Sequence, residues 1–381
     1  MFLALREIAR AKIRFALLAG AIGLLVFLIT FQQGLFGGLV TSFVGAVKNQ
    51  NAPILVFNEQ ARQNVEGSFL FPEQEVAIAG VAGVAESGPI GQNTFTVLVR
   101  PDADAAPVDE DAVVFGYELG GLGQPTTLTE GRLPSGPDEA VASAIDADKG
   151  FDLGDTVTIV GADGPLIEVV GLAEDTQWSV APTLFVSFDT FAAAQRAVNP
   201  AAEVVLPSLI AVQPAPDIGL DELTARIDAQ VAGVEALTRE QAAAQNPGVQ
   251  GVSQSFQIIL ALAFVVVTLV VGFFFLILTT QKAKPLTLLR AVGAPAGYLV
   301  KNLVAQILAV MGAGIVLGVG LTVVLDVVLR SGAIPLDLEP RTVAVTIGSL
   351  LVLSLLGGVV SIRRVLLIDP IRATSDGGRG L

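Results

Sequence analysis

The chain has 381 residues, of which 52% are hydrophobic and 15% are charged, and its mean hydropathy is +0.68. This balance is typical of a membrane protein. The sequence contains no cysteine and no histidine, which excludes disulfides, thiol catalysis, His-based metal sites and Ser-His-Asp chemistry.

Charge is unevenly distributed along the chain. The net charge at pH 7 is −14. Residues 47–250 contain 30 acidic and 8 basic residues, a net of −22, whereas the remainder contains 6 acidic and 14 basic residues, a net of +8. The acidic block predicts a soluble domain, and the basic remainder is expected close to the membrane. Because phosphate binding requires positive charge, no nucleic-acid partner is expected.

The first 47 residues predict a membrane anchor. Residues 1–14 are rich in bases and are expected to form a cytoplasmic N-terminus, either an amphipathic helix in the membrane interface or a plain basic flank. The apolar run that follows exceeds the core of a signal peptide, so 15–47 is predicted to be transmembrane helix 1 with its extension. Gln32 and Gln33 lie near the outer end of this helix. Amides are costly in hydrocarbon, so these side chains indicate either a substrate path or solvation at the interface.

Residues 48–250 have the pattern of a globular extracytoplasmic domain. Short apolar or alternating runs predict strands at 53–57, 94–99, 208–212 and 234–238. Amphipathic patterns with proline or acids in the first turn predict helices at 72–80 and 221–231. Two β-α-β units separated by an insertion indicate a split α/β domain.

The insertion, about 101–199, is expected to be β-rich. Asp163-Gly164-Pro165 is predicted to link two strands of a hairpin, and a further strand is predicted at 183–188. The carboxylates Asp146, Asp148, Asp152 and Asp155 lack the spacing, the central glycine and the terminal glutamate of an EF-hand. They are interpreted as a solvated turn, and no metal site is predicted.

The rest of the chain alternates apolar and basic segments. Transmembrane helices are predicted at 252–280, 302–329 and 342–362, with a cytoplasmic segment at 281–301, an outer loop at 330–341 and a cytoplasmic tail at 363–381. Basic residues in the segment and the tail place both on the cytoplasmic side. The predicted fold class is therefore a membrane α-helical protein with four transmembrane helices and a large α+β domain between the first two.

Nucleotide-binding and hydrolytic motifs are absent. The sequence contains no P-loop, no Gly-x-Gly-x-x-Gly after a strand and no Gly-x-Ser-x-Gly elbow. The chain is therefore not expected to be an enzyme or to carry a cofactor of its own, and any energy for its work must come from another subunit.

Three stretches resemble the permease subunits of FtsX-like/MacB-like ABC transporters. Leu288-Leu-Arg-Ala-Val-Gly-Ala294 resembles the coupling segment of that family. Gly131-Arg-Leu-Pro with Asp138-Glu-Ala-Val, Leu153-Gly-Asp-Thr-Val157 and Val169-Val-Gly171 resembles its external core domain, and Arg363-Arg364 with Asp369-Pro-Ile-Arg372 resembles its tail. The opening residues and the four-span layout are most similar to the haem-exporter (HrtB) and glycolipid-exporter (DevC) branch.

This resemblance implies a homodimer in the bacterial cytoplasmic membrane with two ABC ATPase subunits, which hold the ATP and Mg. It also implies coupling to the ATPase through Lys284, Pro285, Leu288, Leu289, Arg290, Ala291, Val292, Gly293 and Ala294. Pro285 departs from the Glu-Ile-Gly type of sequence found in many relatives, so the coupling helix is expected to begin at or after this residue.

The preferred functional hypothesis is export of an amphipathic molecule, haem or lipid-like, out of the membrane by mechanotransmission. Residues expected to line its path are Phe27, Phe31, Gln32, Gln33, Phe36, Phe256, Phe264 and Met311. Packing against lipid or core is the alternative role for each aromatic. The alternative function is that of FtsX, which transmits force to extracytoplasmic cell-wall hydrolases.

Overall fold

Two compact units make up the structure, a computed structural model that describes residues 12–100, 106–201, 204–281, 295–329 and 336–366. One unit, the helical unit, comprises the chain up to Gly38 together with the chain from Gln254 onward. The other, the globular unit, is Leu39–Ser253. Each unit is described separately below.

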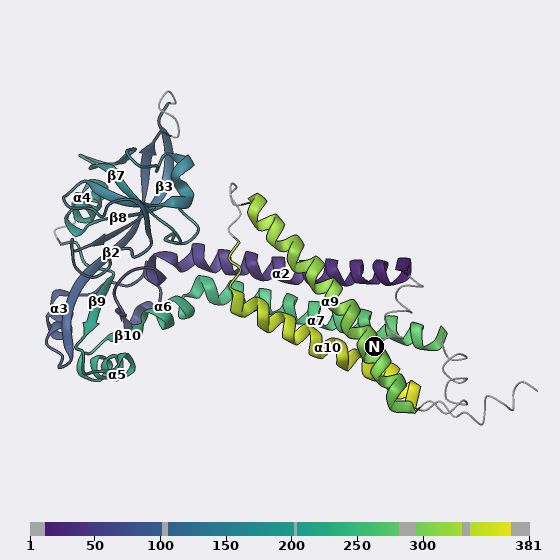
Figure 1. Cartoon of the computed structure of the whole chain (residues 1–381). Coiled ribbons are helices and arrows are strands. Elements are labelled where there is room, and N and C mark those ends of the chain that lie inside the picture. The colour runs from purple at the N-terminus through teal and green to yellow at the C-terminus, as the bar shows by residue number, and fades with distance from the viewer. Residues whose placement is uncertain (1–11, 101–105, 202–203, 282–294, 330–335, 367–381) are drawn as a thin grey trace, which may run out of the picture. The chain divides into compact units, whose positions relative to one another are not determined.

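Four long apolar helices supply the helical unit: α2 (Lys12–Lys48), α7 (Pro247–Gln281), α9 (Ala296–Leu329) and α10 (Pro340–Leu366) (Figure 1). Each contains a stretch that is long and apolar enough to cross a bilayer. Their exposed apolar faces carry leucine, isoleucine and valine side chains that would cost free energy in water. The predicted fold class is therefore confirmed: four membrane helices, with an α+β domain between the first and the second.

Small residues let α2 and α9 approach closely. A Cβ added at Gly318 would lie 2.6 Å from the carbonyl oxygen of Gly23, and one at Gly314 would lie 2.6 Å from a side-chain carbon of Ile22. Close backbone approach between small residues is a common way to associate helices in lipid. Two neighbouring glycines of the same helix, Gly312 and Gly320, face open space.

Polar side chains connect α2 with both α9 and α10. The hydroxyls of Thr30 on α2 and Thr322 on α9 lie 2.6 Å apart, and both residues are buried. Thr346 on α10 donates a hydrogen bond of 2.8 Å to Gln33 on α2. Each such bond satisfies a polar group that would otherwise be unpaired in an apolar interior.

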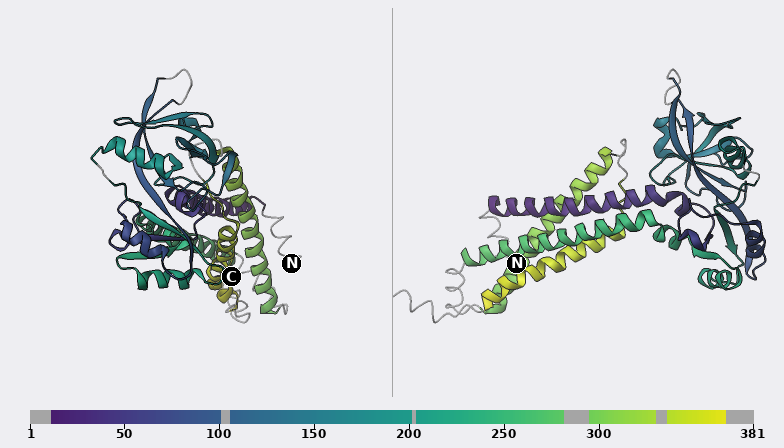
Figure 2. Two further views of the ribbon diagram at one scale, coloured as in Figure 1. Left: turned by 90° about the vertical axis from the view of Figure 1, so that its left-hand side faces the viewer. Right: turned by 180° about the vertical axis from the view of Figure 1, so that it is seen from behind.

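The globular unit is built on one ten-stranded sheet whose main path runs β10-β1-β9-β2-β3-β8-β5-β7-β4, with β6 pairing β2 and β7. Figure 1 labels β2, β3, β7, β8, β9 and β10 of this sheet, and Figure 2 gives two further views. Its strands are β1 (Ile54–Asn58), β2 (Val84–Val99), β3 (Val108–Tyr117), β4 (Leu128–Gly131), β5 (Glu139–Ser143), β6 (Thr156–Ile159), β7 (Leu166–Ala173), β8 (Thr183–Ser187), β9 (Leu209–Pro214) and β10 (Val234–Thr238). Its helices are α3 (Pro72–Ala79), α4 (Phe188–Val198), α5 (Leu220–Gln230) and α6 (Arg239–Gln245), with short 3₁₀ turns η1 (Glu59–Ala61) and η2 (Ala144–Lys149).

The predicted split domain is present. The units β1-α3-β2 and β9-α5-β10 are neighbours in the sheet, and strands β3 to β8 form the insertion between them. β2 is longer than predicted, because it begins at Val84 beside β9 and continues beside β3 into the insertion. The hairpin of β6 and β7 is confirmed.

The sequence reading missed helix α4. It starts at Phe188, directly after strand β8, where the predicted strand was expected to end. Ser187 caps it by accepting a hydrogen bond from the backbone N–H of Thr190, a standard way to begin a helix. Phe191 of α4 then packs edge-on against Phe95 of β2. The apolar run 183–188 conceals this strand-to-helix boundary.

The last turns of α2 are part of the globular unit's core. Val44, Ala46 and Val47 are buried in one cluster with Phe115, Trp178 and Phe185. A loop of residues 174–181, here called the clasp loop, runs along this end of the helix. Backbone bonds join Ala46 N–H to Gln177 O at 3.0 Å and Ser179 N–H to Phe43 O at 3.1 Å.

Gly45 is required at this contact. A Cβ at this position would collide with the carbonyl oxygen of Asp175 in the clasp loop. Three residues of the clasp loop that are not glycine, Asp175, Ser179 and Val180, have φ between 53° and 61°. Such angles are strained for a β-branched residue like Val180, and they persist only where surrounding contacts hold them.

The Gly131-Arg-Leu-Pro…Asp138-Glu stretch folds into an ion-paired turn. Arg132 and Glu139 are joined by two hydrogen bonds of 2.7 and 2.6 Å. Glu139 also accepts the backbone N–H of Ser135 at 2.8 Å. These bonds lower the pKa of Glu139 from 4.5 to about 2. The bonds from Arg132 have the larger effect, and the bond from Ser135 has the next largest.

Replacing Gly45 with valine is expected to lower the free energy of unfolding by about 1–3 kcal/mol, because the new side chain must displace the clasp loop. The melting temperature of the full chain in detergent measures this. The matched control is Gly20→Val on the same helix, where nothing lies within 4 Å of an added Cβ. Equal melting temperatures for the two variants would contradict the packing described above.

The Arg132–Glu139 pair is expected to make stability depend on acid pH. Because the pKa of Glu139 is lower in the folded chain, its stabilisation is complete above about pH 4.5 and is lost as pH falls toward 2. Glu139→Gln should therefore lower the melting temperature at pH 7 by a few degrees, and the difference from wild type should shrink between pH 4.5 and 2. Glu130→Gln, at an exposed position of β4, is the control. A difference that does not change with pH would contradict the assignment.

Candidate functional site

A small cavity lies between α2 and α7 in the helical unit. Its volume is about 60 Å³, and it is lined by two glutamines and a phenylalanine of α2 and by three residues of α7: Gln32, Gln33, Phe36, Phe256, Gln257 and Leu260. We call it the glutamine pocket. Three of the six lining residues carry amides, but the surface that faces the pocket is almost entirely apolar. The volume of the pocket is far below the roughly 300 Å³ of a small-molecule site, so α2 and α7 would have to separate to admit a ligand of that size.

Contacts between the two helices shape the glutamine pocket. The rings of Phe36 and Phe256 lie 5.0 Å apart, within the range of favourable aromatic pairs. Gln32 donates a hydrogen bond of 3.3 Å to the carbonyl oxygen of Phe256. Gln33 accepts from Thr346 of α10. The amide of Gln32 therefore faces α7, and that of Gln33 connects to α10.

The structure brings together four of the residues expected along a substrate path, Gln32, Gln33, Phe36 and Phe256. Phe27 and Phe31 stack on each other along α2, with ring centroids 5.7 Å apart. Phe264 is half-buried against the core of the helical unit. None of these three lines the pocket, although Phe27 and Phe31 lie on the same helix.

Met311 has a different environment. It is fully buried in the core of the helical unit, where Ser354 of α10 donates a hydrogen bond to its sulfur at 3.2 Å. It belongs to the contact between α9 and α10 and does not line the glutamine pocket. Gln257, by contrast, lines the pocket and was not selected from the sequence, where a lone amide at the start of an apolar run gave little signal.

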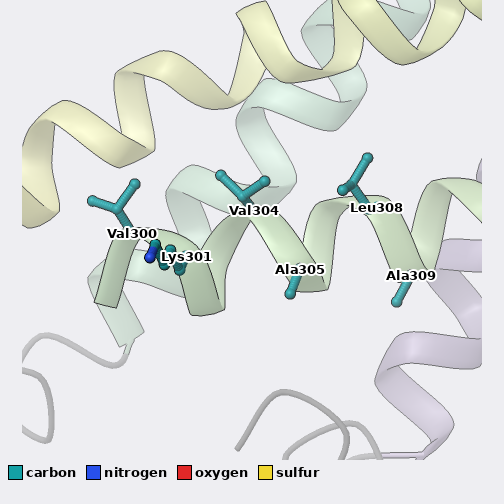
Figure 3. Close-up of a pocket in the computed structure, with 6 residues that line it drawn as sticks. All are labelled: Val300, Lys301, Val304, Ala305, Leu308 and Ala309. Carbon is teal, nitrogen blue, oxygen red and sulfur yellow. The ribbon is translucent and has the colours of Figure 1, made fainter. Parts of the chain in front are cut away.

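A shallow groove of about 520 Å³ lies on α9 and was also missed by sequence reasoning. Its lining includes Val300, Lys301, Val304, Ala305, Leu308 and Ala309. In Figure 3, Val300, Val304 and Leu308 point to one side of the helix, while Ala305 and Ala309 point to the other. Lys301 supplies the only charge among these residues. All six come from one helix, so this is an exposed helix face rather than an enclosed site.

The residues expected to couple to an ATPase, Lys284, Pro285 and 288–294, lie outside the described residues. The structure therefore neither supports nor contradicts that prediction.

The acidic stretch of the insertion is not a solvated turn throughout. Asp146 is 1% exposed, accepts a hydrogen bond of 2.8 Å from Lys149 and is contacted by the amide of Gln177 through both carboxylate oxygens. This corrects the expectation for Asp146. The carboxylate is paired inside the fold, beneath the clasp loop that contains Gln177. Within the described ranges, no group of three or more acidic side chains is arranged to hold a metal ion.

Comparison with known proteins connects these features to a family. Residues 257–370 match the model of the FtsX-like permease C-terminal domain. An uncharacterized ABC transporter permease of Mycobacterium tuberculosis is 26% identical, covering 98% of this chain and 99% of the relative. A protein of Staphylococcus haemolyticus described as a putative hemin transport system permease protein, HrtB, is 22% identical, with 98% and 99% covered.

Solved structures that resemble the chain include the periplasmic region of MacB from Actinobacillus actinomycetemcomitans, with a TM-score of 0.34 and 13% identity, covering 51% of this chain and 91% of that one. The extracellular domain of the transporter YknZ from Gram-positive bacteria gives a TM-score of 0.32 and 16% identity, covering 49% and 100%. By sequence, residues 257–370 match an FtsX-like permease domain, and the chain is similar over almost its whole length to ABC transporter permeases.

Proposed function

We propose that this chain is the permease subunit of an ATP-driven exporter, acting as a homodimer with two ABC ATPase subunits. The observation that carries the proposal is the match to ABC transporter permeases over 98% of the chain. The matched permease domain, 257–370, includes the basic segment 281–301. The absence of a P-loop from the sequence agrees with a separate ATPase.

In this proposal the segment 281–301 lies on the cytoplasmic side and contacts the ATPase. Its bases Lys282, Lys284, Arg290 and Lys301 fit the positive-inside rule. Both chain ends are then cytoplasmic, and the acidic domain 48–250 is extracytoplasmic. The Leu/Ala-rich sequence around Arg290, which is followed by Gly293, would suit a groove on a partner subunit.

The proposed cargo is an amphipathic molecule that enters from the membrane. The glutamine pocket presents a mainly apolar surface that includes two phenyl rings, and one relative's name refers to hemin transport. Haem and lipid-like molecules both have an apolar body with polar or charged groups at one side. The sequence has no histidine or cysteine, and Met311 is buried against Ser354. Haem would therefore be held here by apolar contacts rather than by an axial ligand of those types.

Purification of the C-terminally tagged chain from native membranes in mild detergent tests the partnership. An ATPase subunit is expected to co-purify at about one copy per permease, and Leu289→Asp or Arg290→Glu should remove it. Lys48→Glu, at the far end of α2, is the control for a charge reversal elsewhere. An ATPase missing from the wild-type sample, or retained equally by both coupling variants, would contradict the proposal.

Cross-linking across the glutamine pocket tests export. Because the sequence has no cysteine, Phe36→Cys with Phe256→Cys introduces the only two thiols. Bridging them with a short bismaleimide should abolish stimulation of the complex's ATPase activity by haemin or by phospholipid. The matched control is Phe27→Cys with Phe31→Cys, which bridges one helix only. Stimulation by neither compound in the unmodified complex would contradict export and favour a force-transmitting role.

A further inference from the structure

Two phenylalanines of the globular unit are exposed where the fold gives no reason for them. Phe69 is 47% exposed and Phe71 is 53% exposed, and Val76, just beyond them on α3, is 73% exposed. We call these three residues the aromatic surface. Phenyl rings left in water forgo the free energy of burial, and exposed apolar patches of this kind mark interaction sites.

The backbone of this segment is held in place rather than loose. Ser68 and Leu70 are fully buried, and Leu70 belongs to the core under α3 and α5. Because side chains alternate along an extended chain, the burial of residues 68 and 70 turns Phe69 and Phe71 outward together. The two rings are thus displayed on one face of a fixed strand-like segment.

Hydrogen bonds fix the segment from both sides. The backbone N–H of Leu70 donates to Pro207 O at 3.0 Å, and the side-chain amide of Asn58 donates to Phe69 O at 3.0 Å. The side chain of Gln74 accepts from the backbone N–H of Phe71 at 3.0 Å, which anchors the start of α3. A surface prepared in this way loses little conformational entropy when it binds.

The charges around the aromatic surface are acidic. Glu66 and Glu73 are exposed and flank the two phenylalanines in the sequence, and the half-buried Glu75 follows on α3. Partial burial, and then the charge of Glu118, raise the pKa of Glu75, as expected where carboxylates gather. Between residues 58 and 76 the one base is Arg62. The negative charge of these glutamates would repel an anionic lipid surface, and it would also repel a second copy of the same acidic face.

We propose that the aromatic surface binds an extracytoplasmic protein through a segment that carries apolar side chains flanked by lysine or arginine. Apolar side chains would pack on Phe69 and Phe71, which supply the aromatic core typical of an interface, and the bases would face the glutamates at the rim. The proposal does not depend on what the permease domain transports, because it rests on the globular unit alone.

Photo-cross-linking of the full chain in native membranes tests this inference. Replacing Phe69 or Phe71 with p-benzoylphenylalanine keeps an aromatic ring at the surface, and mass spectrometry identifies the cross-linked peptide. The same replacement at Leu166, which is 59% exposed on β7, is the control. Adducts from positions 69 and 71, but not 166, to one protein segment with apolar and basic residues are expected. No adduct, or adducts with lipid, with a second copy or with an acidic segment, would overturn the proposal.

A binding measurement with the identified segment completes the test. A synthetic peptide of that segment should bind the purified chain, and Phe69→Ser with Phe71→Ser should weaken it by about tenfold or more. Leu166→Ser should leave the affinity unchanged. Raising the salt concentration should weaken binding if the glutamates contribute. Equal affinity for the Phe69→Ser/Phe71→Ser variant and wild type would overturn the proposal. Both substitutions replace exposed side chains, so an unchanged melting temperature verifies that the variant is folded.

Discussion

The close packing of the end of α2 in the core of the globular unit is the contact on which that unit's architecture depends. Val44 and Val47 contribute to the same apolar cluster as Phe115 and Trp178, and the clasp loop adds backbone hydrogen bonds along the helix. Gly45 permits the approach, and the strained angles of the clasp loop are tolerated because these contacts hold them. A displacement of these helical turns would therefore move side chains at the centre of the sheet rather than at its margin.

In the helical unit, polar contacts tie α2, α9 and α10 to one another. Thr30 meets Thr322, Gln33 meets Thr346, and Met311 meets Ser354. Between α2 and α7 the contacts at the glutamine pocket are an aromatic pair and a longer bond of 3.3 Å from Gln32. Farther along the same two helices Arg14 donates a hydrogen bond of 2.7 Å to Gln281, so the weaker contacts between α2 and α7 are found at the pocket.

The sequence is sufficient to predict the elements whose signal is local. Long apolar runs predict the four membrane helices, and alternation predicts most strands, because burial of one face imposes a period on the chain. Helix α4 was missed because Phe188 continues the apolar run of β8. The burial of Asp146 was also missed, since its partner Gln177 lies 31 residues along the chain. Partners this distant leave no periodic pattern in the sequence.

The same limit applies to the candidate site. Gln32 and Gln33 could be selected from the sequence because amides are conspicuous in an apolar span, and the structure places both at the pocket. Met311 was equally conspicuous as a rare residue, but its neighbour Ser354 places it in the contact between α9 and α10. Which of two unusual residues lines a cavity depends on helix pairing, and composition does not encode that pairing.

The clasp loop also has a consequence for the order of biosynthesis. Asn49, just beyond α2, bonds Asp175 of the clasp loop across 126 residues of sequence. At a synthesis rate of about 5–20 residues per second, the C-terminal end of α2 is made roughly 6–25 seconds before the loop that will hold it. Throughout that interval Val44 and Val47 lack their native neighbours. The newly made chain therefore passes through a period in which a membrane insertase or chaperone would meet an unprotected apolar helix end.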